Sequence, residues 1–321
     1  MRVAVLDDYQ GRASGFADWD SLGPDVEVTY FGDPIDADLL ARTLADFDVL
    51  VLMRERTAFP RRVLDRLPRL ALLVTTGMKN ASVDIDHLRE RGVVVCGTGA
   101  PAGPPAPGLP STVEVAWALI LATAKRVTIE DRAVRAGSWQ LDLPTNLAGA
   151  TLGLAGLGRL GAAMAAPARI FGMDVIAWSQ NLTDERAAEV GVRRVTKAEL
   201  LAGSDVLSIH LVLSHRTRGL FGATELALMK PTAVLVNTSR GPIVDEPALI
   251  DALATKTIAA AGLDVFDREP LPPGHALLEL ENAVLLPHLG YVSEAGMRSM
   301  YEQVVEDIAA FRAQAPIRVV S

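Results

Sequence analysis

"TLGLAGLGRLG", residues 151–161, connects an apolar strand pattern to a helical pattern through three glycines, Gly156, Gly158 and Gly161. In a turn of this kind the first glycine permits the tight bend and the second lets the backbone approach a pyrophosphate. The third allows the helix to pack closely on the strand. The N-terminus of the helix adds partial positive charge at the same point. This stretch therefore predicts a parallel α/β fold with a dinucleotide-binding turn.

Short apolar, β-branched runs alternate with helical patterns along the whole chain, which is typical of parallel α/β proteins. The first series of predicted strands covers 2–6, 26–31, 48–53, 70–74 and 93–96. The second series covers 151–156, 174–178, 205–210, 233–239, 258–266 and 283–287. Because a chain of 321 residues is long for a single hydrophobic core, we expect two α/β lobes.

A boundary between the lobes is predicted in "GTGAPAGPPAPGLPST", residues 97–112, which is dense in glycine and proline. The first lobe then covers 1–98 and the dinucleotide-binding domain 99–293, with 294–321 completing the first lobe if the last helix returns to it. Ser111 and Thr112 are suitable N-caps for the next helix, and Glu114 is placed to complete a capping box with Ser111. The last helix is predicted from about 293 to 313, and its pattern alone would allow it to pack on either lobe.

The composition excludes several classes of protein. A net charge of −8 argues against binding to nucleic acids or anionic membranes, which requires clustered basic residues. The single cysteine, Cys96, excludes an internal disulfide framework and fits a reducing compartment. The longest apolar run, 115–124, is far shorter than the roughly 20 residues that span a bilayer. We therefore expect a soluble cytoplasmic protein, and the spacing of ligand-type residues gives no reason to expect a metal site.

The helix predicted over 111–126 contains "TVEVAWALILATAK", which is apolar nearly all round. The surface of one lobe cannot cover every side of such a helix, so a second buried face is expected. This pattern predicts a homodimer built on the helix.

The choice between NAD and NADP is left open by the end of the next predicted strand. An acid is expected there, roughly 20 residues after the glycines, to bind the adenosine ribose. Ser179, Gln180 and Asn181 stand in its place. They neither repel a 2′-phosphate nor clearly attract one, so we expect weak discrimination between the two cofactors.

Charged side chains follow three successive predicted strands. Arg240 lies in "VNTSRGPIVDE", Glu269 in "GLDVFDREP" and His288 in "LPHLG". Taken singly, each has a structural interpretation: a surface ion pair, a solvated turn residue and a histidine that ends a strand. Because ligands of open α/β sheets bind at the carboxyl edge, the three should converge beside the dinucleotide. An arginine to grip a carboxylate, a histidine to exchange a proton and an acid to orient the histidine then predict catalysis.

The stretches "GLGRLG", "VNTSRGPIVDE", "GLDVFDREPLP" and "LPHLG", in this order and spacing, resemble the D-isomer-specific 2-hydroxyacid dehydrogenases. The resemblance implies two Rossmann-like lobes with the last helix folded back onto the first. It implies an oxidoreductase that interconverts a 2-keto acid and a D-2-hydroxy acid, with NAD or NADP as cofactor. Arg240 would bind the substrate carboxylate, His288 would be the acid/base and Glu269 its partner. Asp264 would contact the nicotinamide amide.

The resemblance also extends the predicted binding sites. The residues expected to line the dinucleotide are Gly156, Gly158, Arg159, Leu160, Gly161, Ser179, Gln180, His210, Leu211, Val212, Thr217, Thr238, Ser239, Asp264 and Gly290. Those expected on the substrate side are Arg54, Gly77, Met78, Lys79 and Tyr291. Lys79 stands where the family usually has a second glycine, Tyr291 replaces a small residue, and the loop 97–110 is unusually long. These departures leave the identity of the substrate open.

One alternative belongs to another functional class. Corepressors of this fold keep the nicotinamide pocket and act as NAD(H)-sensing binding proteins without turnover. The chain shows no appended tail or peptide-docking signature that would favour this alternative. Oxidation of NADH with a panel of 2-keto acids would separate the two.

Overall fold

The structure is a computed structural model that describes residues 1–99 and 108–320. It divides into two compact units, the first formed by Met1–Ala106 with Ser293–Ser321 and the second by Pro107–Val292. Most of the predicted boundary loop, residues 100–107, lies outside the described residues. Among the described residues, no helix combines the length and the apolar character needed to cross a membrane.

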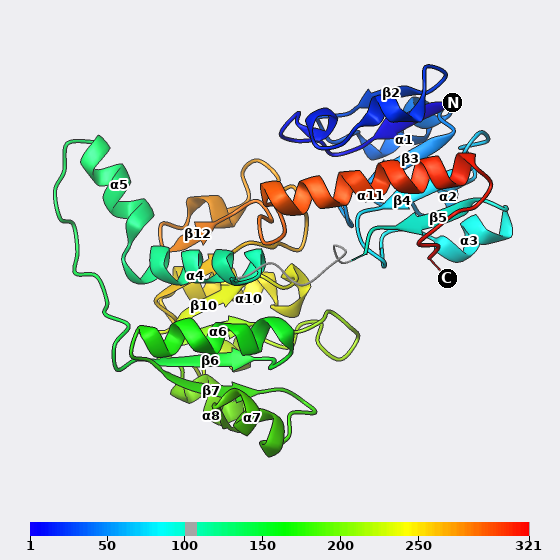
Figure 1. The fold of residues 1–321 in the computed structure, drawn as a ribbon. Helices are drawn as coiled ribbons and strands as arrows, with labels where there is room; N and C mark the ends of the chain where they lie inside the picture. The colour runs from blue at the N-terminus through cyan, green and yellow to red at the C-terminus, as the bar shows by residue number, and fades with distance from the viewer. Residues whose placement is uncertain (100–107, 321) are drawn as a thin grey trace. The chain divides into compact units, whose positions relative to one another are not determined.

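The first unit is built on a five-stranded parallel sheet in the order β2-β1-β3-β4-β5 (Figure 1). Its strands are β1 (Arg2–Val5), β2 (Glu27–Tyr30), β3 (Val49–Leu52), β4 (Leu72–Thr75) and β5 (Val94–Gly97). Helices α1 (Ala37–Leu44), α2 (Arg61–Leu64) and α3 (Ile85–Glu90) share one apolar cluster with the sheet. Two 3-10 helices, η1 (Ala13–Gly15) and η2 (Trp19–Leu22), follow β1.

The last helix, α11 (Glu294–Arg312), packs on β4 and β5 of the first unit. Its buried side chains include Tyr301 and Ile308. Beyond it the chain runs along the edge strand, where Val320 N donates to Val95 O (2.8 Å). Arg318 Nε donates to the buried Asp307 of α11 (2.9 Å) and ties this tail to the helix. The predicted return of the last helix to the first lobe is therefore confirmed.

The second unit contains a seven-stranded parallel sheet in the order β12-β11-β10-β9-β6-β7-β8. The strands are β6 (Thr151–Ala155), β7 (Asp174–Trp178), β8 (Arg193–Arg194), β9 (Val206–Ile209), β10 (Val234–Asn237), β11 (Ala260–Leu263) and β12 (Ala283–Leu285). The order of the strands reverses beside β6, the first strand of the unit, with β7 on one side and β9 on the other. Such a switch point is where open α/β sheets bind ligands.

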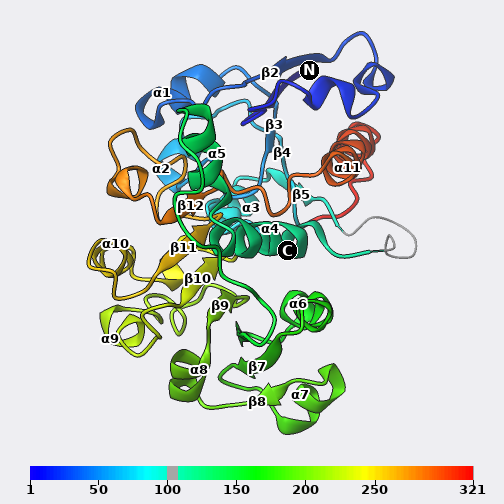
Figure 2. The ribbon, with the colours of Figure 1, turned by 90° about the vertical axis from the view of Figure 1, so that its left-hand side faces the viewer.

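Helices cover both faces of the second sheet. Two apolar clusters lie on opposite faces, one shared with α4 (Ser111–Ala124) and α6 (Arg159–Ile170), the other with α8 (Lys197–Gly203), α9 (Ala223–Leu226) and α10 (Glu246–Ala254). Figure 2 shows α8, α9 and α10 on one side of the strands and α6 on the other. The remaining elements are α5 (Val127–Arg135), α7 (Asp184–Val190) and the 3-10 helices η3 (Gly241–Ile243) and η4 (Ala276–Glu279). Each predicted strand is present, and the two-residue β8 is an addition.

The predicted capping box at the start of α4 is wrong. The N-cap residue is Pro110, which has no side-chain oxygen, and Ser111 is already the first helical residue. Thr112 is used differently, because its hydroxyl donates to Gly290 O (2.7 Å). A hydrogen bond to a residue far away in the sequence has replaced the local cap.

Candidate active site

The glycine turn after β6 has the geometry that its spacing predicts. Gly156 has φ +105°, and a Cβ there would lie 2.4 Å from His210 O. A Cβ on Gly161 would lie 2.1 Å from Gly156 O. At Gly158, by contrast, a Cβ would meet no atom of the described residues within 4 Å. Two of the glycines are therefore required by close packing, and the second leaves its backbone open to a ligand.

The start of α6 completes a site for an anion. Gly158 is its N-cap and supplies no side-chain acceptor to the first N–H groups, which begin at Arg159 and Leu160. Gly156 N donates to Trp178 O (2.8 Å), so the turn also lies against the end of β7, where Ser179 and Gln180 follow. Open N–H groups at the start of a twelve-residue helix, beside an open glycine, fit the pyrophosphate of a dinucleotide.

His210 follows β9 and packs beneath the glycine turn. Its backbone N–H donates to Ala155 O (2.8 Å), and its Nε2 lies 2.9 Å from Ser208 Oγ. Burial lowers the pKa of His210 to about 4, so the ring is neutral near pH 7. Its role in cofactor binding stays a prediction, and the observed contacts describe a ring that supports the turn.

The loop after His210 is braced from within. Leu211 packs toward Gly156, and its Cδ2 would lie 3.1 Å from a Cβ there. The Thr217 hydroxyl donates to Val212 O (2.7 Å) and closes the loop. Val212 itself is 84% exposed. This arrangement leaves the Val212 side chain available to a ligand at the sheet edge.

The turn that presents Arg240 is built by the buried Asn237. Its Nδ2 donates to Arg240 O (3.0 Å), and its Oδ1 accepts from Ser239 N (3.0 Å). Ser239 Oγ donates to Ile209 O on the neighbouring strand (2.7 Å). Thr238 Oγ1 is buried without a hydrogen-bond partner among the described residues. An unpaired buried hydroxyl at this edge fits a polar group of the cofactor.

Glu269 and His288 meet at the same edge, after β11 and before α11. Glu269 Oε2 lies 2.6 Å from His288 Nδ1, and its Oε1 accepts from Phe266 N (2.9 Å). Both side chains are mostly buried, with 28% and 19% of their surface exposed. Because the carboxylate accepts at Nδ1, that nitrogen carries a proton and Nε2 remains for a substrate.

Asp264 holds the turn in which His288 lies. His288 has φ +54°, an unusual backbone conformation for a residue other than glycine. The carboxylate of Asp264 accepts from Leu289 N (2.6 Å) and Gly290 N (2.8 Å), the two N–H groups that follow. Burial raises the pKa of Asp264 to about 6, and these two N–H groups act in the opposite direction. The structure thus shows Asp264 as an anchor of the His288 turn.

In the first unit, the predicted substrate-side loop is folded around Asn80. The Nδ2 of this buried residue donates to Arg54 O (2.7 Å) and to Thr75 Oγ1 (3.0 Å). Gly77 has φ +142°, and a Cβ there would lie 2.9 Å from Arg54 Nη1. The guanidinium of Arg54 therefore lies over the backbone of Gly77, an arrangement suited to a carboxylate. Met78 and Lys79, which follow, are exposed.

Comparison with known proteins agrees with this geometry. A family model described as D-isomer specific 2-hydroxyacid dehydrogenase, NAD binding domain, matches residues 117–290. The chain belongs to this dehydrogenase family. A glyoxylate reductase of Korarchaeum cryptofilum is 36% identical over 87% of this chain and 84% of its own. A D-3-phosphoglycerate dehydrogenase of Archaeoglobus fulgidus is 34% identical over 99% of this chain and 58% of its own.

Solved structures of the family share the fold. A phosphoglycerate oxidoreductase from Vibrio cholerae O395 superposes with a TM-score of 0.90 at 34% identity, covering 98% of this chain and all of that one. The parallel sheets and the return of α11 are thus those of a dehydrogenase of this family.

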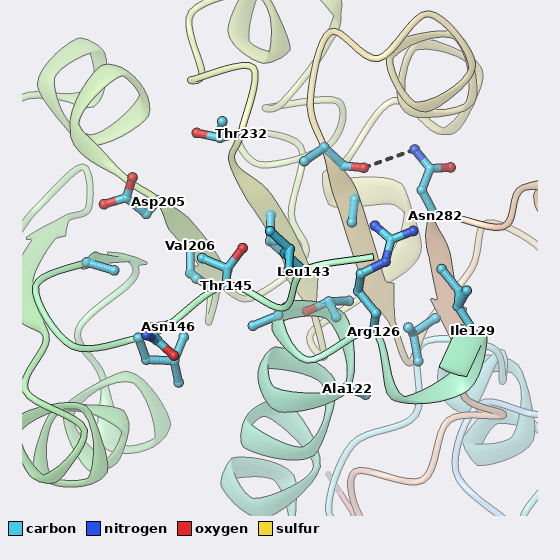
Figure 3. Close-up of a pocket in the computed structure, with 18 of the residues that line it drawn as sticks. Ala122, Arg126, Ile129, Leu143, Thr145, Asn146, Asp205, Val206, Thr232 and Asn282 are labelled. Atoms are coloured by element: carbon cyan, nitrogen blue, oxygen red, sulfur yellow. Dashed lines mark hydrogen bonds between the residues drawn. The ribbon is translucent and has the colours of Figure 1, made fainter. Parts of the chain in front are cut away.

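The dehydrogenase also contains a cavity of about 510 Å³ in its second unit, at the opposite edge of the sheet. Figure 3 shows Asp205, Val206 and Thr232 at the starts of β9 and β10, with Arg126 and Ile129 from the α4–α5 region on another side. The glycine turn, Arg240 and His288 are at the carboxyl ends of the strands. This cavity is therefore separate from the candidate active site.

Sequence reasoning missed the residues that hold the site in place. Asn80 and Asn237 brace the Arg54 and Arg240 turns, and Thr112 binds the His288 turn at Gly290. The role of Asn237 could have been predicted from the sequence, since the side chain of an Asn just before a sharp turn often forms a hydrogen bond with the backbone of that turn. Thr112 had no local signal, because its partner is 178 residues away.

Tyr291 lies against His288 in the dehydrogenase. The two rings meet edge to face, with centroids 5.2 Å apart. The tyrosine thus forms one wall around the imidazole, which fits its predicted position on the substrate side.

Proposed function

We propose that the protein interconverts a 2-keto acid and a D-2-hydroxy acid, with His288 as the acid/base. The observation that carries this proposal is the 2.6 Å contact between His288 Nδ1 and Glu269 Oε2, at the carboxyl edge of the NAD-binding unit. The glyoxylate reductase and phosphoglycerate dehydrogenase relatives support the class of substrate.

In the reduction, negative charge develops on the carbonyl oxygen of the keto acid. A bound nicotinamide cofactor supplies the hydride in this direction and accepts it in the reverse. His288 donates a proton from Nε2 to the developing alkoxide, while Glu269 at Nδ1 stabilises the charged imidazole and fixes its orientation. Arg240 grips the substrate carboxylate with its planar guanidinium and polarises the carbonyl.

The cofactor is proposed to be NAD, with NADP also accepted. Ser179 and Gln180 follow β7 beside the glycine turn, and the uncharged Asn181 is next. A missing contact shifts binding by about 1–3 kcal/mol, so kcat/KM for NADH and NADPH should differ by less than roughly a hundredfold. Steady-state kinetics with both cofactors tests this, and a ten-thousandfold preference would reveal a selecting group elsewhere.

The predicted substrate contacts divide between the two units. Arg54, Gly77, Met78 and Lys79 belong to the first, and Tyr291 to the second. The Arg54 guanidinium over the Gly77 backbone supports the first group as a carboxylate site. The edge-to-face contact with His288 supports Tyr291 as a wall of the reaction site.

A homodimer through the helix predicted over 111–126 is also proposed. Seven residues of α4 are buried within the unit, while Glu114 and Ala118 on its outer side are exposed. The segment after it exposes apolar side chains, with Trp139 75% and Leu143 89% exposed. Apolar residues gathered in this way mark a contact surface. Light scattering at micromolar concentration should give twice the mass of 34.2 kDa, and a monomer would contradict the proposal.

The decisive experiment is a panel of 2-keto acids, beginning with glyoxylate, hydroxypyruvate and pyruvate and extending to bulkier analogues, with NADH oxidation as the readout. Turnover of at least one member supports the proposal. Tight binding of NADH without turnover across the panel would favour the sensing function.

The single cysteine and acidic composition support a cytoplasmic location for this activity.

A further inference from the structure

The loop that carries Glu269 has both of its ends bound to one carboxylate, that of Glu246. Glu246 is the first residue of α10. Its Oε2 accepts from Asp267 N (3.1 Å), at the start of the loop. Its Oε1 lies 3.2 Å from His275 Nε2, at the end of the loop. Glu269 lies between these two points, two residues after the first.

The hydrogen bonds of His275 define its protonation. Its Nδ1 accepts from Leu277 N (3.3 Å), so this nitrogen carries no proton. The proton is therefore on Nε2, the nitrogen that lies 3.2 Å from Glu246 Oε1. Leu277 is buried in the core of the second unit, and His275 is the N-cap of η4. Through His275, the end of the loop is anchored to the core as well as to Glu246.

The start of the loop has little room to move. A Cβ on Gly241 would lie 2.1 Å from the Phe266 carbonyl carbon and 2.5 Å from Asp267 N, so the two backbones are in direct contact. Phe266 N donates to Glu269 Oε1 (2.9 Å). A displacement of Asp267 would therefore move Phe266 and, with it, the carboxylate that must stay within 2.6 Å of His288.

Other charged groups surround this carboxylate. Burial raises the pKa of Asp267, and the nearby charges of Glu246 and Asp245 raise it further, while the charge of Arg218 lowers it. Glu246 thus lies beside two other acids, an arrangement that costs free energy. Its side chain is nevertheless only 15% exposed and both oxygens are bound.

We propose that Glu246 and His275 are positioning residues that hold Glu269 against His288 by bridging the two ends of the loop 267–275. This inference rests on the proposed acid/base role of Glu269 and His288. Among the described residues, the hydrogen bond and ion pair of His288 are made with Glu269 and not with either positioning residue, so each acts through the loop.

Two substitutions break the bridge and one preserves it. Glu246→Ala removes both contacts. His275→Asn keeps a short acceptor for Leu277 N but does not reach Glu246, whereas His275→Gln retains a donor near the position of Nε2. Since a displacement of about 1 Å near a reacting group can cost roughly a hundredfold, we expect the first two to lower kcat about tenfold or more. KM for NADH should change less than about twofold, and His275→Gln should recover most of the lost kcat.

Glu225 provides a matched control in the same unit. One of its carboxylate oxygens binds Lys197 Nζ (2.9 Å) and the other accepts from Gly222 N (3.1 Å), so both of these bonds are made outside the loop 267–275. Glu225→Ala should lower the unfolding temperature to a degree similar to Glu246→Ala and leave kcat unchanged. An equal loss of kcat in both variants would show that the effect comes from general destabilisation, and would overturn the proposal.

A double-mutant cycle tests whether the bridge acts through Glu269. Glu246→Ala should lower kcat in the wild-type background and have little further effect in a Glu269→Gln background. Equal losses in both backgrounds would overturn the proposal. A Glu269→Gln variant with full kcat would instead refute the acid/base role itself, and the bridge with it. If Glu246→Ala does not fold, the same cycle is run with His275→Asn, with His275→Gln as its folded reference.

Discussion

His288 and His210 belong to the same sheet and follow the carboxyl ends of their strands, yet their surroundings are opposite. His288, beyond β12, has Glu269 Oε2 2.6 Å from its Nδ1 and keeps part of its ring exposed. His210, directly after β9, lies beneath the glycine turn with Ser208 Oγ 2.9 Å from its Nε2. Burial lowers the pKa of His210 to about 4.

The difference shows that position at the edge of the sheet does not by itself make a histidine chemically active. An imidazole that must gain and lose a proton needs a partner for its charged form and access for the substrate. His288 has a carboxylate at its Nδ1, whereas His210 has a neutral hydroxyl at Nε2 and a buried Nδ1 without a hydrogen-bond partner among the described residues. Four substitutions test this contrast.

His288→Ala should have the largest effect. Loss of the general acid should lower kcat for keto-acid reduction by about 10²–10⁴, while the affinity for NADH stays nearly unchanged. Rapid-mixing kinetics and fluorescence titration with NADH measure the two quantities. A variant with near-full kcat would make His288 as structural as His210.

Arg240→Lys should have the second-largest effect. Arg240 follows β10, and the lysine keeps its positive charge but loses the planar fork that binds a carboxylate through two hydrogen bonds. Loss of a charge-assisted hydrogen bond, at about 1.5–3 kcal/mol, predicts a fall in kcat/KM of roughly 10–100-fold. Steady-state kinetics with the best keto acid measures it, and retention of full kcat/KM would show that Arg240 is a surface ion-pair residue.

Glu269→Gln should convert His288 toward the state of a histidine with a neutral partner. The shape is kept and the negative charge is removed, so the charged imidazole is less favoured. The basic limb of the reduction profile should move to lower pH, and kcat just above neutral pH should fall about tenfold. A profile of kcat against pH that does not move would make Glu269 a bystander.

His210→Asn should mainly change the free energy of unfolding at acid pH. The pKa of His210 is lowered in the folded state from an unfolded value near 6.5, so its stabilising contribution is complete above that pH. The contribution is lost as the pH falls toward about 4 and amounts to at most about 3 kcal/mol. Between pH 7 and pH 4.5 the free energy of unfolding should therefore fall less in the variant than in the wild type. Denaturant unfolding at the two pH values measures this difference.

Comparison of the variant with the wild type cancels the contributions of other groups, including Asp264 and Asp307, whose pKa values burial raises. Equal losses in the two proteins would mean that His210 is not held neutral by the fold, and the contrast with His288 would weaken.

Much of the fold could be predicted because its signals are local. The alternation of apolar runs and helical patterns gave the five strands of the first sheet and six of the second, all of which are confirmed. The glycine spacing predicted a strand–turn–helix, and the structure requires glycine at 156 and 161. The two-residue β8, "RR" at 193–194, was missed because two polar residues give no apolar pattern.

The predicted capping box illustrates where local signals fail. Ser111 and Glu114 have the spacing of the motif, but the helix begins one residue earlier and Thr112 binds Gly290 instead. The roles of Glu246 and His275 could not be predicted for the same reason, since Glu246 at the start of α10 meets a loop that lies more than 20 residues further along the chain.

The sequence by itself determined the order of strands and helices, the glycine turn and the residues Arg240, Glu269 and His288 that follow successive strands. Periodicity and turn chemistry depend only on neighbours along the chain, so these features can be read directly. Only the tertiary structure decided that His288 meets a carboxylate while His210 meets a neutral hydroxyl beneath the glycine turn. It also decided that Asp264 anchors the His288 turn and that Glu246 holds both ends of the Glu269 loop. Such contacts arise when strands far apart in sequence become neighbours, and their distances and burial then set the chemistry of each side chain.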